Sequence, residues 1–407
     1  MYLQLLGLVV LLAVLWIRKR FCYWKDLGVP YVQPTFPHGN LRGIGSTYHM
    51  AHITVNVYRK LKGATEGLGF AGGIQSINDR EGEVEMKELL ARFTTDVIGN
   101  CAFGLECNSL KDPHAEFRRM GKKVFQASRI RIMKRFLTSQ FKEISRRLGI
   151  TNTASDVASF FLSAVKDTVQ YRTKHNVQRN DFMTLLMELM QEGDSGKLSI
   201  EEASAQAFVF FLAGFETSST AMSFCLYELA LSQDLQNKAR ECVRETFDRH
   251  GAMTYEALMD MKYIEMCINE SLRKYSPAAT LLRTATQNYP VPGTKHIIPQ
   301  GQTVIIPVHA IHLDPAYYPN PDRYDPERFS DEARAKRNPY AFLPFGEGPR
   351  NCIGLRFGMM QARIGMAMLL KHFRFTLSPS MPQPMKVSAG STVFSIEGGL
   401  FLQVEKI

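Results

Sequence analysis

The stretch Phe345-Gly-Glu-Gly-Pro-Arg-Asn-Cys352-Ile-Gly354 decides the fold, because the rest of the chain is organised around Cys352. Its glycines and proline predict irregular backbone before the cysteine. The segment from Leu355 to Lys371 is apolar at helical spacing and contains no proline, so it predicts a helix. Cys352 therefore stands where a loop enters a helix N-terminus, and the positive end of the helix dipole favours a thiolate there.

The residues around the cysteine suit a large flat ligand. Gly348 and Gly354 have no Cβ, so such a ligand can approach the backbone closely. Arg350 offers a guanidinium fork for a carboxylate, and Phe345 stands where it can shield the sulfur from water. A lone cysteine is more often a buried structural residue, but a chance match to the whole pattern is rare. No second Cys or His stands at ligand spacing, which argues against zinc.

This stretch resembles the haem-binding loop of the cytochrome P450 superfamily. The resemblance implies that the Cys352 thiolate is the axial ligand of haem b (iron protoporphyrin IX). It also implies that Phe345, Arg350 and Gly354 contact the cofactor, with Arg350 facing a haem propionate.

A second motif lies in a long apolar segment that we expect to be a helix over residues 199–232. Ser199-Ile-Glu-Glu202 is a capping box that starts this helix. In its middle, Ala213-Gly-Phe-Glu-Thr217 combines a glycine, a buried acid and a threonine that can bond back to the helix backbone. A kinked core helix with its acid facing water is the alternative. The family resemblance implies that Glu216 and Thr217 are the acid–alcohol pair that delivers protons during oxygen activation.

A third motif pairs Glu270 and Arg273 on one face of a helix expected over residues 260–275. The spacing alone is a weak signal, but its order relative to Pro326-Glu-Arg-Phe329 and the cysteine loop matches the family. The resemblance implies a buried structural network of Glu270, Arg273 and Arg328, and a contact of Arg283 with a haem propionate. An ordinary surface helix pair is the alternative.

The N-terminus predicts a membrane anchor over residues 1–20. Met1 to Ile17 is almost wholly apolar and would span about 26 Å as a helix, and a basic triplet follows it. By the positive-inside rule, the chain behind the triplet stays cytosolic; a cleaved signal peptide is the alternative. A proline-rich hinge follows at 21–45, and residues 46–407 are expected to form the catalytic domain. The resemblance implies attachment to the endoplasmic reticulum membrane.

Composition narrows the class of protein. The 407 residues are 45% hydrophobic, and the seven cysteines form no CxxC pair, which favours a reducing compartment. The net charge of +10 suits an anionic lipid surface or an acidic partner. Because the basic residues are dispersed along the chain, we do not expect nucleic-acid binding.

The expected fold is mainly α-helical with small β-sheets, which is the cytochrome P450 fold in incomplete form. Helices are expected at 83–104, 113–127, 136–148, 154–175 and 181–191, and a β-rich region is expected at 280–312. Glu397-Gly-Gly399 predicts a hairpin with a strand on either side.

Residues 63–83 depart from the family pattern. Five glycines fall between 63 and 73, and no helix or strand pattern is evident. The family carries several elements here, among them a Trp-x-x-x-Arg motif that binds a haem propionate; neither Trp16 nor Trp24 is followed by such an arginine. A segment that includes two helices and part of the N-terminal sheet is therefore expected to be missing.

The closest resemblance is to the insect microsomal family six group, whose members oxidise plant toxins and insecticides. It implies a monooxygenase that inserts one oxygen atom from O2 into lipophilic small molecules, with electrons from an NADPH-dependent flavoprotein reductase. The missing segment raises the alternative of a catalytically impaired or inactive form. A haem-thiolate isomerase or lyase is a further alternative, against which the presence of both Glu216 and Thr217 argues.

Overall fold

The computed structural model describes residues 82–125, 134, 138, 141–179, 181–191, 198–388, 391 and 393–407. The expected anchor at 1–20, the hinge at 21–45 and nearly all of the 63–83 region lie outside the described residues. The helices are α3 (Met86–Phe103), α4 (Glu116–Phe125), α6 (Lys142–Arg147), α7 (Ser155–His175), α8 (Phe182–Gln191), α9 (Ile200–Leu231), α10 (Gln233–His250), α11 (Tyr255–Asp260), α12 (Lys262–Lys274), α13 (Val308–His312), α14 (Asp331–Lys336) and α15 (Leu355–His372).

The described part of the chain is mainly helical with small antiparallel sheets, as the sequence predicts. One sheet has the strand order β1-β7-β6, formed by Gly82–Glu85, Phe401–Lys406 and Phe373–Leu377. A second pairs β2 (Leu281–Thr284) with β5 (Thr303–Ile306), and a third pairs β3 (Tyr289–Pro290) with β4 (Ile297–Ile298). Short 3-10 turns at Pro326–Phe329, Pro339–Ala341 and Gly348–Arg350 link the later elements.

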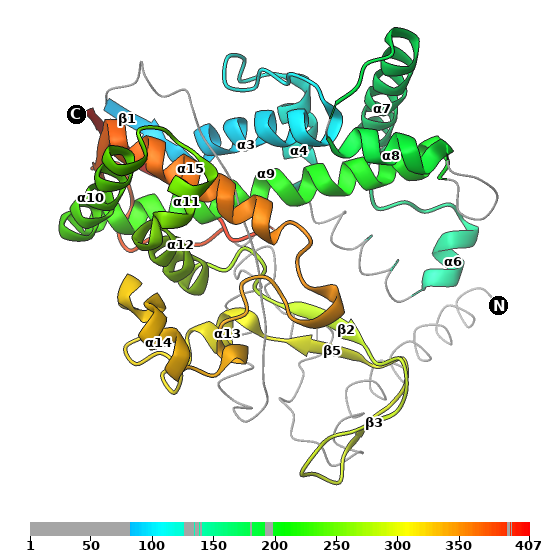
Figure 1. Ribbon diagram of the computed structural model, residues 1–407. Helices are drawn as coiled ribbons and strands as arrows, with labels where there is room; N and C mark the ends of the chain where they lie inside the picture. The colour runs from blue at the N-terminus through cyan, green and yellow to red at the C-terminus, as the bar shows by residue number, and fades with distance from the viewer. Residues whose placement is uncertain are drawn as a thin grey trace, which may run out of the picture.

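Helix α9 runs through the middle of the helical part of the structure (Figure 1). Its capping box forms as predicted, with Ser199 Oγ accepting from the Glu202 N–H at 3.1 Å and Glu202 Oε2 accepting from the Ser199 N–H at 2.9 Å. At 32 residues it is about 48 Å long. It packs against α3, α7, α8, α12 and α15. By length and composition alone α9 could cross a membrane, but most of its apolar stretch is buried inside the protein, as in a core helix.

Two apolar clusters meet along α9. One joins the α3 start, the second half of α9, α12, α15 and the three-stranded sheet. The other is rich in phenylalanine and joins α3, α7, α8 and the first half of α9; Phe103, Phe161, Phe211 and Phe215 are all at most 1% exposed. Burial of these rings between α3, α7 and α9 fixes the position of the middle of α9, where the Gly-Phe-Glu-Thr motif lies.

Two sequence predictions are wrong in detail. The helix expected from Glu83 begins at Met86, because residues 82–85 pair with β7 and the Glu85 carboxylate caps the helix. The hairpin expected around Glu397 does not form, because β7 pairs with β1 and β6, whereas Ile396 before the turn forms a bridge with Val387. Gly398 and Gly399 both have positive φ. The N–H of Leu400, which follows them, donates to Glu85 Oε1 at 2.7 Å.

Candidate functional site

Cys352 opens onto a cavity of about 950 Å³. The cavity lies between the middle of α9, the cysteine loop with the start of α15, the end of α3 and the first part of α8. Its lining is mainly apolar and includes Ile98, Ala213, Gly214 and Phe357. Thr217 and Gly354 also line it. The structure therefore brings Cys352, Gly354 and Thr217, which belong to two different motifs, onto one cavity.

The cysteine loop holds the sulfur at the start of α15, as the sequence predicts. The Cys352 N–H donates to the Phe345 carbonyl oxygen at 2.6 Å, which closes the loop. Gly346 and Gly348 both have positive φ, and that conformation favours glycine. A Cβ on Gly354 would lie 3.9 Å from Cys352 Sγ, so the glycine leaves that side of the sulfur open. Burial raises the pKa of the Cys352 thiol, and a hydrogen bond from the Gly354 N–H opposes that rise.

Thr217 and Glu216 point in different directions from α9. Thr217 Oγ1 donates to the Ala213 carbonyl oxygen at 2.7 Å, one turn earlier, and the threonine lines the cavity. Glu216 is not among the described residues that line the cavity. Its carboxylate forms an ion pair with Lys87 of α3, with Lys87 Nζ 2.9 Å from Glu216 Oε1. Glu216 therefore lies at the α3–α9 interface, whereas Thr217 lies at the cavity wall.

Lys87 is enclosed by acceptors from α9. Its Nζ also donates to the Glu216 carbonyl oxygen at 3.0 Å and to Ser219 Oγ and Thr220 Oγ1, both at 2.7 Å. Burial lowers the pKa of Lys87, and the charge of Glu216 partly offsets this effect. Nothing in the sequence marks Lys87, because a single lysine near a helix start has no distinguishing pattern.

Glu270, Arg273 and Arg328 lie together, as the third motif predicts. Glu270 and Arg273 are 0% exposed, and the Arg273 fork donates to both carboxylate oxygens at 2.6 and 2.8 Å. Arg328 Nε stands 3.4 Å from Glu270 Oε1, close enough for an ion pair but without hydrogen-bond geometry. Burial raises the pKa of Glu270, and Arg273 offsets part of that rise. Arg273 also donates to the His312 and Pro321 carbonyl oxygens, so the network ties α12 to the segments before the cysteine loop.

The two arginines expected near a propionate lie side by side outside the cavity lining. Arg283 on β2 donates through Nη2 to the Arg350 carbonyl oxygen at 3.5 Å, and Arg350 is exposed. Neither arginine nor Phe345 is among the described residues that line the cavity. The sequence also gave no reason to single out Gln361 of α15, which lines the cavity two turns beyond the cysteine loop.

Comparison with known proteins agrees with this geometry. The cytochrome P450 family model matches residues 73–402. Cytochrome P450 6A1 of Musca domestica is 37% identical over 494 aligned positions, which include 99% of this chain and 97% of that protein. The probable cytochrome P450 6a13 of Drosophila melanogaster is 37% identical over 476 positions, covering 97% of each. Cytochrome P450 6a2 of the same fly is 47% identical over 396 positions, which cover 94% of this chain and 75% of the fly protein.

The family match includes both walls of the cavity and the residues of all three motifs. With more than three quarters of the chain matched and relatives well above 30% identity, the resemblance inferred from the cysteine loop is confirmed. The chain belongs to the cytochrome P450 family of haem-dependent monooxygenases.

Proposed function

We propose that this protein inserts one oxygen atom from O2 into lipophilic small molecules, such as plant toxins or insecticides, at a haem b bound through Cys352. One observation carries the proposal: Cys352 and Thr217, from elements far apart in the chain, open onto the same mainly apolar cavity. An apolar cavity of about 950 Å³ suits a flat macrocycle together with part of a lipophilic substrate.

The residues present fit the haem on both sides of the cavity. On one side the sulfur stands at a helix start with open space over Gly354. On the other, the Ala213-Gly214 stretch of α9 presents no bulky side chain toward the cavity. When bound, a thiolate-ligated haem supplies the electron density that favours cleavage of the O–O bond.

The chain's own residues have distinct roles in this proposal. Cys352 holds the cofactor, and the Phe345 carbonyl fixes the cysteine loop through the Cys352 N–H. Thr217 holds a hydroxyl at the cavity wall, where it can pass a proton. Glu216 exchanges that proton when its carboxylate leaves Lys87. Arg283 and Arg350 supply positive charge beside the cysteine loop for the propionates.

Electrons come from an NADPH-dependent flavoprotein reductase, and the protein works at the endoplasmic reticulum membrane with its catalytic domain in the cytosol. The apolar run and basic triplet of residues 1–20 support this location, as does similarity to the insect family six relatives.

A catalytically impaired form is the second candidate, and one observation favours it. The alignment with cytochrome P450 6A1 runs over 494 positions, 87 more than the 407 residues of this chain, so at least 87 positions of that relative have no counterpart here. Loss of whole elements around a cofactor site weakens cofactor retention, because proteins have only about 5–15 kcal/mol of stability to lose.

The test is turnover under isotopically labelled oxygen. The full chain, loaded with haem, is combined with an NADPH-dependent reductase and naphthalene under ¹⁸O₂. We expect naphthol carrying one labelled oxygen, dependent on NADPH and absent in the variant Cys352→Ser. The variant Cys242→Ser, which changes a cysteine of α10 that does not line the cavity, should retain activity. No naphthol despite bound haem would contradict the monooxygenase and favour the impaired form.

A further inference from the structure

The carbonyl oxygens of residues 213–216, in the middle of α9, all accept a hydrogen bond from a side chain. The first two accept from Thr217 Oγ1 and Ser218 Oγ of α9 itself. The last two, those of Phe215 and Glu216, accept from side chains of α3. A carbonyl oxygen has two lone pairs, so it can bind such a donor in addition to the helical N–H. This stretch of α9 is therefore held by side chains as well as by its own backbone, and it coincides with the Gly-Phe-Glu-Thr motif.

Thr94 of α3 holds the Phe215 carbonyl. The Thr94 side chain is 0% exposed, and its Oγ1 donates to the Phe215 oxygen at 2.9 Å. The Ala91 oxygen of its own helix is a second acceptor, but it is farther away, at 3.3 Å, and Thr95 Oγ1 already donates to it at 2.6 Å. Because a hydroxyl carries a single hydrogen, this geometry directs the Thr94 hydrogen to α9.

Lys87 holds the next carbonyl along α9. Its Nζ donates to the Glu216 carbonyl oxygen at 3.0 Å, in addition to its ion pair with the Glu216 carboxylate. The Phe215 carbonyl belongs to the peptide unit before the Glu216 Cα, and the Glu216 carbonyl belongs to the unit after it. Helix α3 therefore holds both peptide units that flank Glu216, and the second unit leads directly into Thr217. The backbone sets the direction of each Cα–Cβ bond, so α3 also sets where these two side chains point.

The face of α3 that contacts α9 allows a close approach. The two helices lie side by side (Figure 1). The residues of this face stand at helical spacing, and they are Lys87, Ala91, Thr94 and Ile98. Ala91 is small and 0% exposed, and a Cβ on Gly214 of α9 would lie 2.7 Å from the Ile98 side chain. Helix packing, rather than a loop, thus brings the two donors to successive peptide units of α9.

We propose that Thr94 is a positioning residue for oxygen insertion, which holds the Thr217 hydroxyl at the cavity wall through the Phe215 carbonyl. Lys87 supports the same turn of α9. The inference rests on the proposed function, in which Thr217 passes a proton. Thr94 is not among the described residues that line the cavity, so its effect reaches the site through α9. Without the Thr94 hydroxyl, this turn loses one tie to α3, and Thr217 spends less time where the proton is needed.

Loss of this position should change the fate of the electrons from NADPH. In the coupled reaction, one NADPH, one proton, one O2 and the substrate give the hydroxylated product, water and NADP+. When the proton is delivered at the wrong place, one NADPH, one proton and one O2 give hydrogen peroxide and NADP+, and the substrate is unchanged. The ratio of hydrogen peroxide formed to NADPH consumed therefore reports on the proton donor, whereas loss of folded protein lowers both quantities in proportion.

The first test needs no haem. Amide hydrogen exchange of the full chain in detergent is followed by mass spectrometry in the wild type, Thr94→Val and Thr94→Ser. Thr94→Val removes the hydroxyl at nearly constant volume, so exchange in peptides that cover residues 215–220 should become about fivefold faster, the effect of one lost hydrogen bond. Thr94→Ser keeps the hydroxyl and should exchange as the wild type does. Thr94→Cys, whose thiol is a weak donor, should lie between them, and it replaces Thr94→Val if that variant does not fold.

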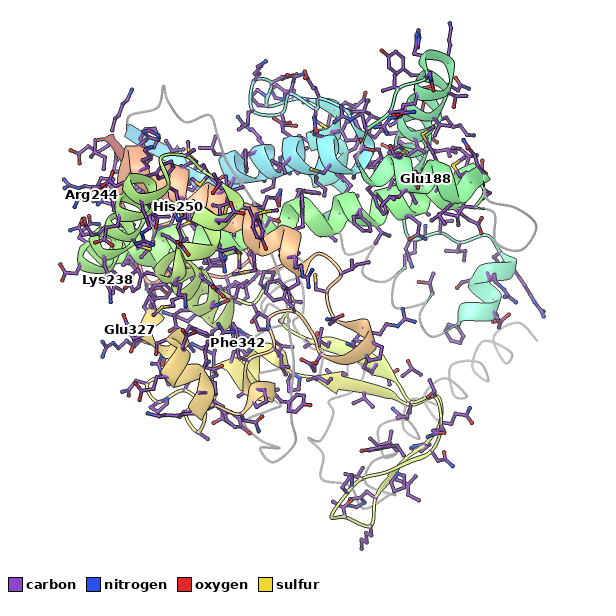
Figure 2. All side chains as sticks on the ribbon, viewed as in Figure 1. Glu188, Lys238, Arg244, His250, Glu327 and Phe342 are labelled. Carbon is purple, nitrogen blue, oxygen red and sulfur yellow. The ribbon has the colours of Figure 1, made fainter. Side chains whose placement is uncertain are left out.

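Thr246→Val in α10 is the matched control. Thr246 is also buried, and its Oγ1 donates at 2.7 Å to a carbonyl of its own helix, that of Cys242. Figure 2 shows Arg244 of the same helix at the opposite end of the molecule from Glu188, which lines the cavity. This variant should leave the exchange of residues 215–220 unchanged relative to that of other α9 peptides.

The second test measures the peroxide ratio of the haem-loaded full chain with the reductase and naphthalene. The ratio should rise at least about threefold in Thr94→Val, because a misplaced proton donor is much less effective. Thr94→Ser and Thr246→Val should match the wild type. Thr217→Val should raise the ratio by itself, and the double variant should match Thr217→Val alone, because Thr94 acts through that hydroxyl.

Three results would overturn the inference: equal exchange of residues 215–220 in Thr94→Val and the wild type, faster exchange with an unchanged peroxide ratio, or effects of Thr94→Val and Thr217→Val that multiply in the double variant. A wild type that binds no haem or forms no naphthol would instead count against the proposed function. The exchange test would still decide whether the Thr94 hydroxyl holds this turn of α9.

Discussion

Lys87 of α3 and Glu216 of α9 form an ion pair in which Lys87 Nζ lies 2.9 Å from Glu216 Oε1. The pair holds the Glu216 carboxylate at the interface between the two helices. Both side chains are largely buried, at 19% and 12% exposure. Three further acceptors on α9 bind the same ammonium group. The pair therefore sets the register of α3 on α9, and through it the position of Thr217 at the cavity wall.

Replacing Lys87 by methionine should destabilise the protein by about 2–4 kcal/mol, because Glu216, Ser219 and Thr220 lose their common donor while remaining buried. Urea unfolding followed by circular dichroism measures the change. The double variant Lys87→Met with Glu216→Gln should lose less than the sum of the two single losses. Lys262→Met, which removes an exposed lysine paired with Asp331, is the control and should have no measurable effect. A Lys87→Met variant as stable as the wild type would show that the pair does not hold the helices.

The Arg172–Asp181 pair joins the end of α7 to the start of α8. Its two hydrogen bonds are 2.8 and 2.6 Å long, and the side chains are 3% and 7% exposed. Asp181→Asn should cost about 3 kcal/mol, because it leaves a buried guanidinium without its countercharge. Thermal unfolding measures the loss, and Glu143→Gln, in the exposed pair with Arg146, should leave Tm unchanged. Equal Tm values for the two variants would contradict this account of the α7–α8 junction.

Stability should fall at acid pH through Glu88. Burial alone would raise the pKa of this carboxyl, but the hydrogen bond and charge of Arg118, helped by Lys122, outweigh burial and lower the pKa from 4.5 to about 2. Because the folded pKa is lower than the unfolded one, the contribution is complete above about pH 4.5 and is lost as the pH falls toward 2. It amounts to about 2–3 kcal/mol.

Comparison of wild type and Glu88→Gln isolates this contribution from that of Asp181, whose pKa is also lowered to about 2. The difference in unfolding free energy between the two proteins should be largest near pH 6 and shrink below pH 4.5. A difference that stays constant across this range would rule out the charge of Glu88 as its source.

Gly214 of α9 packs tightly against Ile98 of α3. A Cβ at this position would stand 2.7 Å from Cδ1 and Cγ1 of Ile98. Gly214→Ala should therefore destabilise the protein by about 1 kcal/mol, because overpacking outweighs the gain in helix propensity. Ile98→Ala removes the clash, so the double variant should lose less stability than the sum of the two single losses. Strictly additive losses in urea unfolding would contradict the close approach.

The sequence predicts most of the helical fold, for identifiable reasons. Of the predicted site residues, Cys352, Gly354 and Thr217 line one cavity, whereas Glu216, Phe345, Arg283 and Arg350 are not among the described residues that line it. The cysteine loop and the Ser199 capping box are encoded by local residue identity, so α15 and α9 begin where expected. The strand at Gly82–Glu85 and the failed hairpin at Glu397 depend on pairing with distant strands, which local pattern does not specify. Glu216 was identified from its motif, but its partner Lys87 comes from packing of α3 on α9. Thr94 likewise became distinctive only when its contact with α9 was known.

The central claim is that Cys352 binds the haem iron through its thiolate. The carbon monoxide difference spectrum of the reduced, haem-loaded full chain tests it most directly, with Cys352→Ser and Cys101→Ser measured alongside. We predict a thiolate-type Soret shift in the wild type and in Cys101→Ser, and its loss in Cys352→Ser. A haem-containing wild type without that shift, or a Cys352→Ser variant that retains it, would contradict the account.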